Sequence, residues 1–539
     1  MLRKLSAALL LGLAGTLSAQ SASPSSDAHA SAAFDAARRG GPLTLHAYLG
    51  KMPKGADLHM HLSGAVYAET FLKDAAEDQL CVDPVQHLFL KNSGLTRTQP
   101  PLAVCSEGQI SAAAVFRNQK IYDAMVDAFS MRSFVPSSGV SGHDQFFATF
   151  DRFGGLDKKH TGEWLDEVAT RAAAQNEQYL EVMITPPFST AAKLGYQMGW
   201  PVPVTLASGS DTSAAPEPDG ASRTELAALR DKLLSGGLLD DVQTDRAELD
   251  GDLAERNRIE HCGEANAAPA CSVQLRVIYQ VLRAFPPQQV FAQTLLAFEV
   301  ASADPNVVGL NFVQPEDAYM AMSEYHRQML MLDYLHSVYP QVHISLHAGE
   351  LAAGMVPPAG LRFHIREAVD LGHAERIGHG VDILDETDSA LLLKELSERH
   401  VMVEINLTSN DVILGIVPPN HPLPNYRAAH VPVALSTDDE GVSRIDLTNE
   451  YVRAVLEFGL SYADLKQMVR TGIEHTFLPG PSLWQKKDDF THVVADCANQ
   501  PLGAETPKPT CMSFLKDSAH AAQEWELEHR FRVFESSLP

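Results

Sequence analysis

The sequence VHISLHAG at residues 342–349 is a short apolar run, typical of a buried strand, that ends in a histidine and a glycine. Seven other runs share this character, and helix-length segments separate most of them: GADLHMHL (55–62), QYLEVMIT (178–185), VQLRVIYQV (273–281), VVGLNFV (307–313), RIGHGVDI (376–383), VMVEINLTS (401–409) and VPVALSTDD (431–439). Strands that alternate with helices form a parallel sheet, and eight of them close a (β/α)8 barrel. We therefore predict an α/β fold, a TIM barrel. The alternative, an open doubly wound sheet, would gather its ligand at a single switch point.

Side chains that can bind a metal or move a proton follow several of these strands: His59, His61, His347, Glu350, His379, Asp438 and Asp439. In a barrel these strand ends meet at one mouth, where catalytic groups lie. Residues i and i+2 of a strand point the same way, so His59 and His61 can reach one ion. With His347 and Asp438 they would supply three nitrogens and one oxygen, which suits one Zn²⁺ per chain. Fe²⁺ or Co²⁺ would fit the same ligands.

Each motif also has an ordinary structural reading. A lone H-x-H is common, STDDEG can be a solvated turn or a helix N-cap, and HAGE can be a loop. Their convergence favours the metal site, because buried charged groups cost several kcal/mol unless they are paired or bound to a metal.

Two other zinc signatures are excluded. His373 and Glu375 match H-x-E, but no P-C-x-x-C follows, and no H-E-x-x-H occurs. The strand at 307–314 carries no lysine, which disfavours two metals bridged by a carboxylated lysine. The sequence therefore favours a single metal.

Composition limits the classes of partner. The 539 residues include 42 Lys+Arg and 68 Asp+Glu, for a net charge of −26, and 45% of them are hydrophobic. This is a globular composition, and surfaces that bind a phosphate backbone need clustered Lys and Arg. A nucleic acid polymer is therefore a poor candidate partner, whereas a small-molecule ligand is compatible with this net charge and composition.

The first 22 residues resemble a secretory signal peptide. Arg3 and Lys4 precede an apolar run at 5–17, and small residues follow near Ala19 and Ala22. About 13 apolar residues are too few to span a bilayer, which needs about 20. We predict an exported protein without a membrane span; the sequence leaves open whether it stays in a periplasm or is secreted.

Export favours disulfides. The cysteines form three couples that are local in sequence and lack C-x-x-C spacing: Cys81 and Cys105, Cys262 and Cys271, and Cys497 and Cys511. We predict three local disulfides, although six cysteines allow many other connectivities.

The domain prediction follows from these features: a linker or short helix at 23–50, a barrel at 51–480 with insertions at about 74–140 and 186–272, and a C-terminal extension at 481–539 that packs on the barrel. A Ser/Pro/Gly/Asp stretch at 207–220 is predicted to be a surface excursion. The insertions could be lids, disulfide-stapled loops or an interaction surface, and a homo-oligomer through them is left open.

Five segments together resemble the adenosine deaminase group of the amidohydrolase superfamily, over about residues 53–476: MPKGADLHMHLSGA (52–65), SLHAGE (345–350), RIGHGVDI (376–383), NLTSN (406–410) and LSTDDEGV (435–442). The resemblance implies a barrel of the metallo-dependent hydrolase type in an exported member of that group. It also implies a zinc site formed by His59, His61, His347 and Asp438. Glu350, His379 and Asp439 resemble the catalytic and base-recognition residues.

The implied reaction is hydrolytic deamination of adenosine, and of 2′-deoxyadenosine, to inosine or its deoxy analogue and ammonia. In it Glu350 protonates purine N1, His379 orients and helps to deprotonate the attacking water, and Asp439 bonds to N7. Two positions depart from the group and concern substrate binding: Ser63 replaces an aspartate that contacts the ribose, and Gln314 replaces a glycine whose amide meets purine N3.

Two alternatives stay open, and the departures bear on the first of them. One is a deaminase of a related aminopurine, such as adenine or an N6-substituted or phosphorylated adenosine. The other is a secreted nucleoside-binding protein without turnover.

Overall fold

The computed structural model describes residues 26–90, 105–137, 139–156, 158–201 and 221–538. The predicted signal peptide and the predicted excursion at 207–220 lie outside these ranges. Within them, no helix combines the length and the apolar composition needed to cross a membrane.

Eight parallel strands form one sheet in the order of the chain, which confirms the predicted TIM barrel. They are β1 (Gly55–His61), β5 (Glu177–Ile184), β6 (Gln274–Leu282), β7 (Val307–Val313), β8 (His343–Ala348), β9 (Arg376–His379), β10 (Met402–Ile405) and β11 (Val433–Leu435). Their side chains are almost all buried, because helices cover the outer face and packed side chains fill the interior.

The barrel closes through residues that follow β11. The backbone N–H of Asp438 donates to His59 O at 2.8 Å, and the N–H of His61 donates to Asp438 O at 2.9 Å. The N–H and hydroxyl of Thr437 donate to the buried carboxylate of Asp57, at 3.1 and 2.6 Å. We call these contacts the barrel seam. They place the end of the last strand, β11, beside the end of the first strand, β1.

Helices surround the barrel as each strand leads into the next: α3 (Leu62–Ala65), α8 (Thr161–Ala174), α12 (Pro287–Ala303), α13 (Tyr319–Val338), α14 (His364–Asp370), α15 (Ser389–Glu398), α16 (Leu407–Leu414), α17 (Leu423–Ala428), α18 (Glu440–Ser443), α19 (Leu447–Phe458) and α20 (Tyr462–Glu474). Capping residues fix several helix starts; Ser461, for example, forms a reciprocal capping box with Asp464.

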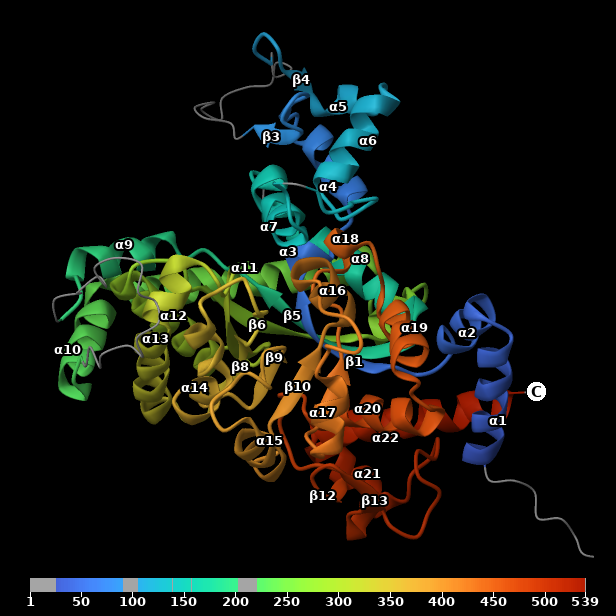
Figure 1. Cartoon of the computed structure of the whole chain (residues 1–539). Coiled ribbons are helices and arrows are strands. Elements are labelled where there is room, and N and C mark those ends of the chain that lie inside the picture. The colour runs from blue at the N-terminus through green and yellow to red at the C-terminus, as the bar shows by residue number, and fades with distance from the viewer. Residues whose placement is uncertain (1–25, 91–104, 138, 157, 202–220, 539) are drawn as a thin grey trace, which may run out of the picture.

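The first and last described helices pack together. The segment at 23–50 holds two helices, α1 (Ser26–Arg39) and α2 (Pro42–Leu49), and α1 lies against α22 (Ala519–Ser537) (Figure 1). The C-terminal extension also contains β12 (Trp484–Lys486), β13 (Asp489–Val493) and α21 (Pro509–Asp517). The buried Lys466 ammonium of α20 bonds to Glu535 of α22 at 2.5 Å, which fixes the extension on the barrel.

The first insertion forms what we call the upper lobe, residues 68–156. It contains α4 (Ala68–Glu77), β2 (Cys81–Asp83), β3 (Leu88–Leu90), β4 (Ile110–Ser111), α5 (Ala112–Val115), α6 (Gln119–Ala128) and α7 (Gly142–Phe153). Most of the lobe projects away from the barrel, whereas α7 lies next to the barrel mouth (Figure 1). The apolar cluster of the lobe also includes Ile413 of α16 and Val442 of α18.

The second insertion contributes α9 (Ser189–Met198), α10 (Arg223–Leu233) and α11 (Leu239–Ile259). Helix α9 packs on α12, and α11 packs on α8. At this contact Gly162 of α8 lies so close to α11 that an added Cβ would stand 2.7 Å from Glu255 Cβ and 3.1 Å from Asp252 O. The insertion therefore packs closely against the barrel helices.

Disulfides join Cys81 to Cys105, Cys262 to Cys271 and Cys497 to Cys511. The prediction of three local disulfides is confirmed. The first disulfide lies in the upper lobe, the second at the end of the second insertion, and the third within the C-terminal extension.

Candidate metal centre and active site

The four predicted ligands converge at the mouth of the barrel. His347 Nε2 lies 3.1 Å from both His59 Nε2 and His61 Nε2, and Asp438 Oδ1 lies 3.4 and 3.2 Å from the same two nitrogens. Four atoms placed at tetrahedral corners about 2.0 Å from a zinc ion would be about 3.3 Å apart. The donor atoms therefore have the spacing of a tetrahedral metal site.

Hydrogen bonds to the Nδ1 atoms of two rings leave their Nε2 atoms directed at the same point. His59 Nδ1 bonds to Glu404 Oε2 at 2.6 Å and His347 Nδ1 bonds to Asn311 Oδ1 at 2.8 Å. Because these oxygens accept, each Nδ1 carries a proton, and in a neutral ring the Nε2 atom keeps a lone pair. The two Nε2 atoms lie 3.1 Å apart, so both lone pairs can bind one metal ion. The donor set thus fits one divalent metal ion.

Glu404 is held as a charged partner for His59. Burial raises the pKa of its carboxyl, but the ion pair with Arg376, at 2.7 Å, and the bonds to His59 and Ser345 together outweigh burial and hold the pKa below its usual value. The hydroxyl of Ser345 donates to the same carboxylate at 3.1 Å. Sequence reasoning missed Glu404, although a charged residue within the apolar run VMVEI was an available signal.

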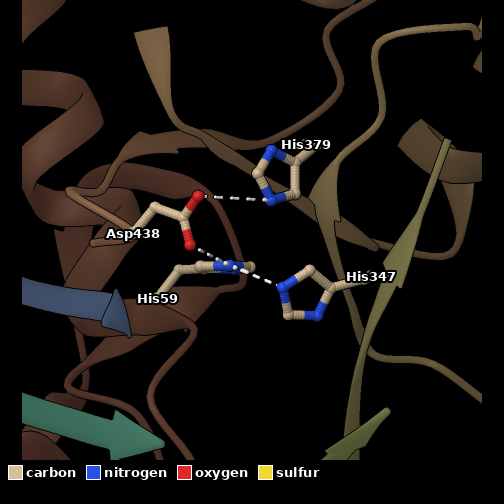
Figure 2. A group of neighbouring side chains, drawn as sticks. All are labelled: His59, His347, His379 and Asp438. Atoms are coloured by element: carbon tan, nitrogen blue, oxygen red, sulfur yellow. Dashed lines mark hydrogen bonds and ion pairs between the residues drawn. The ribbon is translucent and has the colours of Figure 1, made fainter. Parts of the chain in front are cut away.

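His379 faces this cluster from the end of β9. Figure 2 shows the rings of His59, His347 and His379 and the carboxylate of Asp438 around one space. His379 Nε2 lies 3.8 Å from Asp438 Oδ2 and 3.7 Å from Glu350 Oε1, and Asn410 contacts its Nδ1 at 3.0 Å. The ring is fully buried, so Nε2 is directed at the site and not at solvent.

Three residues at this mouth have left-handed backbones that residues other than glycine rarely adopt: Gln314 (φ 93°), His379 (φ 68°) and Asp438 (φ 62°). Each follows or ends a barrel strand. Such conformations cluster at functional sites, where the surrounding structure enforces them.

Glu350 is held by its backbone. The N–H groups of Gly349 and Glu350 donate to the buried carboxylate of Glu316, at 3.1 and 2.7 Å, and His364 Nδ1 bonds to that carboxylate at 2.5 Å. Burial raises the pKa of Glu350 to about 7; His379 opposes this shift, and the charge of Asp438 adds to it. A substantial fraction of Glu350 is therefore protonated near neutral pH and can donate.

Asp439 lies beside Asp438 and packs on Gly64. A Cβ at residue 64 would stand 1.4 Å from Asp439 Oδ1, so only glycine fits there. Burial and the adjacent charge of Asp438 raise the pKa of Asp439 well above its usual value. Its Oδ1 has no hydrogen-bond partner among the described residues and lies at the cavity that contains the metal ligands.

We expect Gly64→Ala to lower kcat/KM by about 100-fold, because a displacement of about 1 Å can cost that much. The added methyl must push Asp439 aside, whereas the metal ligands keep their places. Steady-state kinetics and metal content would check this expectation. Gly251→Ala is the matched control, since its helical position has nothing within 4 Å of the added Cβ. Full activity in Gly64→Ala would contradict the placement of Asp439.

These residues line a cavity of about 410 Å³. Predicted residues His61, Ser63, Gln314, His347, Glu350, Asp438 and Asp439 are all on its wall. The Gln314 side chain turns partly away, since its Oε1 accepts from the N–H of Ala284 at 2.8 Å. Sequence reasoning missed the aromatic wall that Phe146, Phe147 and Phe150 of α7 supply. Their spacing in FFATF, typical of an amphipathic helix, could not show which surface they face.

One family of known proteins matches part of this chain. Residues 253–489 match the adenosine deaminase family. That segment contains His347, Glu350, His379, Asp438 and Asp439, while His59 and His61 lie outside it and are joined to it by the barrel seam.

Two curated relatives match part of the chain. Adenine deaminase of Rhizobium leguminosarum bv. trifolii is 28% identical over 218 residues, which are 40% of this chain and 62% of the relative. Adenosine deaminase of Escherichia coli is 37% identical over 137 residues, which are 25% of this chain and 38% of the relative. The chain thus spans less than two thirds of the length of these curated relatives.

A solved structure supports the fold. A zinc-bound amidohydrolase from Burkhoderia ambifaria matches with a TM-score of 0.51 and 18% identity, over 92% of this chain and 94% of the other. At that identity the likeness bears on architecture alone.

Proposed function

We propose that this protein is a hydrolytic deaminase of an aminopurine nucleoside, with adenosine as substrate and one Zn²⁺ per chain. The observation that carries the proposal is the position of Glu350, whose pKa burial raises to about 7, beside a set of three imidazoles and one carboxylate with tetrahedral spacing. The match to the adenosine deaminase family agrees with this chemistry.

A zinc ion in this site would supply the nucleophile by lowering the pKa of a bound water towards ~7. The chain supplies the proton transfers. Glu350, protonated near neutral pH, donates to purine N1 and so makes C6 more electrophilic. His379, fixed by Asn410, orients the attacking water and accepts its proton. Purine N7 is an acceptor, so Asp439 must be protonated to bond to it, which its raised pKa allows.

Export is part of the proposal. The N-terminal pattern of two basic residues, a short apolar run and small residues supports it, and three disulfides agree with an oxidising compartment.

The test is metal analysis combined with the ultraviolet change of adenosine, measured for the purified protein beside adenine, 2′-deoxyadenosine and adenosine 5′-monophosphate. We expect about one zinc per chain and conversion of adenosine with release of ammonia. If the protein contains zinc but converts only adenine, the metal site would stand and the substrate would be adenine instead of adenosine. Zinc with binding but no turnover would favour a nucleoside-binding protein, and a protein with neither metal nor turnover would refute the proposal.

The pH profile gives a separate check. Glu350 must be protonated to donate, and its pKa is raised to about 7, so activity is present below that value and falls as the pH rises through it. We expect kcat/KM for adenosine to fall about tenfold per pH unit above about pH 8. Unfolding temperatures over the same range would separate this loss from denaturation. A flat profile to pH 10 would contradict the role of Glu350.

A further inference from the structure

A second group of side chains that can bind a metal lies where the upper lobe meets the barrel. We call Asp74, Glu77, His160 and Glu163 the junction cluster. One carboxylate oxygen or ring nitrogen of each lies within 4.8 Å of those of the others. Asp74 and Glu77 are three residues apart on α4, and Glu163 follows three residues after His160, the N-cap of α8. Because side chains at this spacing share a helix face, each helix supplies two ligands to one place.

The ring of His160 is oriented as a metal ligand would be. Its Nε2 lies 3.2 Å from Asp78 Oδ1, while its Nδ1 lies 3.3 Å from Glu163 Oε2 and 3.9 Å from Asp74 Oδ1. Histidines that bind metals commonly donate their other N–H to a carboxylate, which fixes the ring and leaves the second nitrogen for the ion. Asp78 is placed to be that partner. The ring is only 2% exposed, so this orientation is held by the protein.

Asp74 adds a buried oxygen without a hydrogen bond. The side chain is fully buried, and its Oδ2 accepts from the Nε1–H of Trp164 at 2.7 Å. Its Oδ1, the atom nearest to His160 Nδ1, has no hydrogen-bond partner within the part of the chain that the structure describes. A buried carboxylate oxygen that lacks a donor is costly, and a cation bound at this point would offset that cost.

The two glutamates open the cluster to solvent. The side chains of Glu77 and Glu163 are 50% and 39% exposed. The ammonium group of Lys73 lies 3.7 Å from Glu77 and 4.0 Å from Glu163, on a side chain that is itself mostly exposed. Such exposed ion pairs contribute little free energy. A metal ion can therefore enter from solvent and replace the ammonium group.

We propose that the junction cluster binds one divalent transition-metal ion, such as Zn²⁺, which joins α4 of the upper lobe to α8 of the barrel. An imidazole nitrogen among carboxylate oxygens suits Zn²⁺, whereas Ca²⁺ and Mg²⁺ prefer oxygen alone. The cluster has one imidazole where the barrel site has three, so it binds the ion more weakly and fills only when metal is added. Its residues do not line the active-site cavity, so the proposal is independent of the deaminase function.

Titration of the dialysed protein with Zn²⁺ tests the proposal. We expect calorimetry to show binding of about one further ion per chain. The added ion should raise the unfolding temperature and slow amide hydrogen exchange in α4. In the double variant E77Q/E163Q, which keeps the shape of both side chains, the affinity for this ion should fall about tenfold or more, since loss of even an outer partner of a metal-binding histidine costs that much.

Two further variants make the comparison specific. Asp166→Asn is the matched control, because it removes one charge from α8 while its carboxylate contacts Thr170 and not the cluster. Its affinity for Zn²⁺ should stay within about threefold of the unmodified protein, since a lone charge near the surface is screened by salt. Glu163→Gln alone repeats the test with a single change at a half-exposed position, and unfolding temperatures without added metal would show that each variant is folded.

Three results would overturn the proposal and leave the deaminase function untouched. Absence of any further binding would show that Lys73 and a protonated His160 neutralise the carboxylates by themselves. Equal affinity in E77Q/E163Q and the unmodified protein would identify an adventitious ion only. Binding of Ca²⁺ or Mg²⁺ as tight as that of Zn²⁺ would show that His160 is not a ligand.

Discussion

Glu350→Gln is expected to lower kcat/KM for adenosine by about 10³- to 10⁴-fold, the upper range for loss of a positioned general acid. A glutamine amide fills the same space next to His379 but cannot deliver a proton to the ring. The metal ligands and the backbone bonds to Glu316 are unaffected by the change. The measurement is the rate of ammonia release together with zinc content and the unfolding temperature of the variant.

Glu386→Gln is the matched control for this experiment. Burial raises the pKa of Glu386 to about 7 as well, but its carboxylate accepts from the N–H groups of Ile365 and Arg366 and does not line the cavity. An amide oxygen can accept the same bonds, so we expect activity within a few-fold of the unmodified protein. Comparable losses in both variants would show that Glu350 acts through stability and not through proton donation.

His347→Ala should abolish stable zinc binding and lower kcat/KM by roughly three or more orders of magnitude, because several kcal/mol of charge stabilisation are lost with the metal. His347 Nε2 lies 3.1 Å from the Nε2 atoms of both His59 and His61, so the substitution removes the donor atom that is next to both other nitrogens. Metal analysis after dialysis, and titration of activity with added Zn²⁺, would measure the effect.

His343→Ala is the control on the same strand, since its ring is partly exposed and bonds to Glu375 outside the cavity. Glu404→Gln should give an intermediate result, with zinc affinity about 10- to 100-fold weaker, as for other partners of metal-binding histidines. Full zinc content in His347→Ala would contradict the ligand assignment.

Local patterns predicted much of this molecule. All eight barrel strands were located from apolar runs, because a strand buried on both faces is apolar along its length. The meeting of His59, His347 and Asp438 followed from barrel geometry alone, and the disulfides followed from sequence proximity and the expectation of export.

Other features lay beyond sequence reasoning because they depend on contacts between distant segments. Phe146 and Phe150 reach the cavity only because the upper lobe places α7 at the mouth. His160 meets Asp74 of the upper lobe, a contact that no local pattern revealed. Glu316 holds Glu350 across 34 positions of sequence, and the loop sequence QPED around Glu316 gave no sign of that role.

The seam between Asp438 and the first strand also bears on the order of assembly. The Asp438 carboxylate faces the histidine cluster while its backbone joins His59 and His61. The four candidate ligands therefore come together only after the two ends of the barrel have met, and a partly synthesised chain has no complete set of them. We expect metal binding to follow closure of the barrel and to slow amide hydrogen exchange at His61 and Asp438.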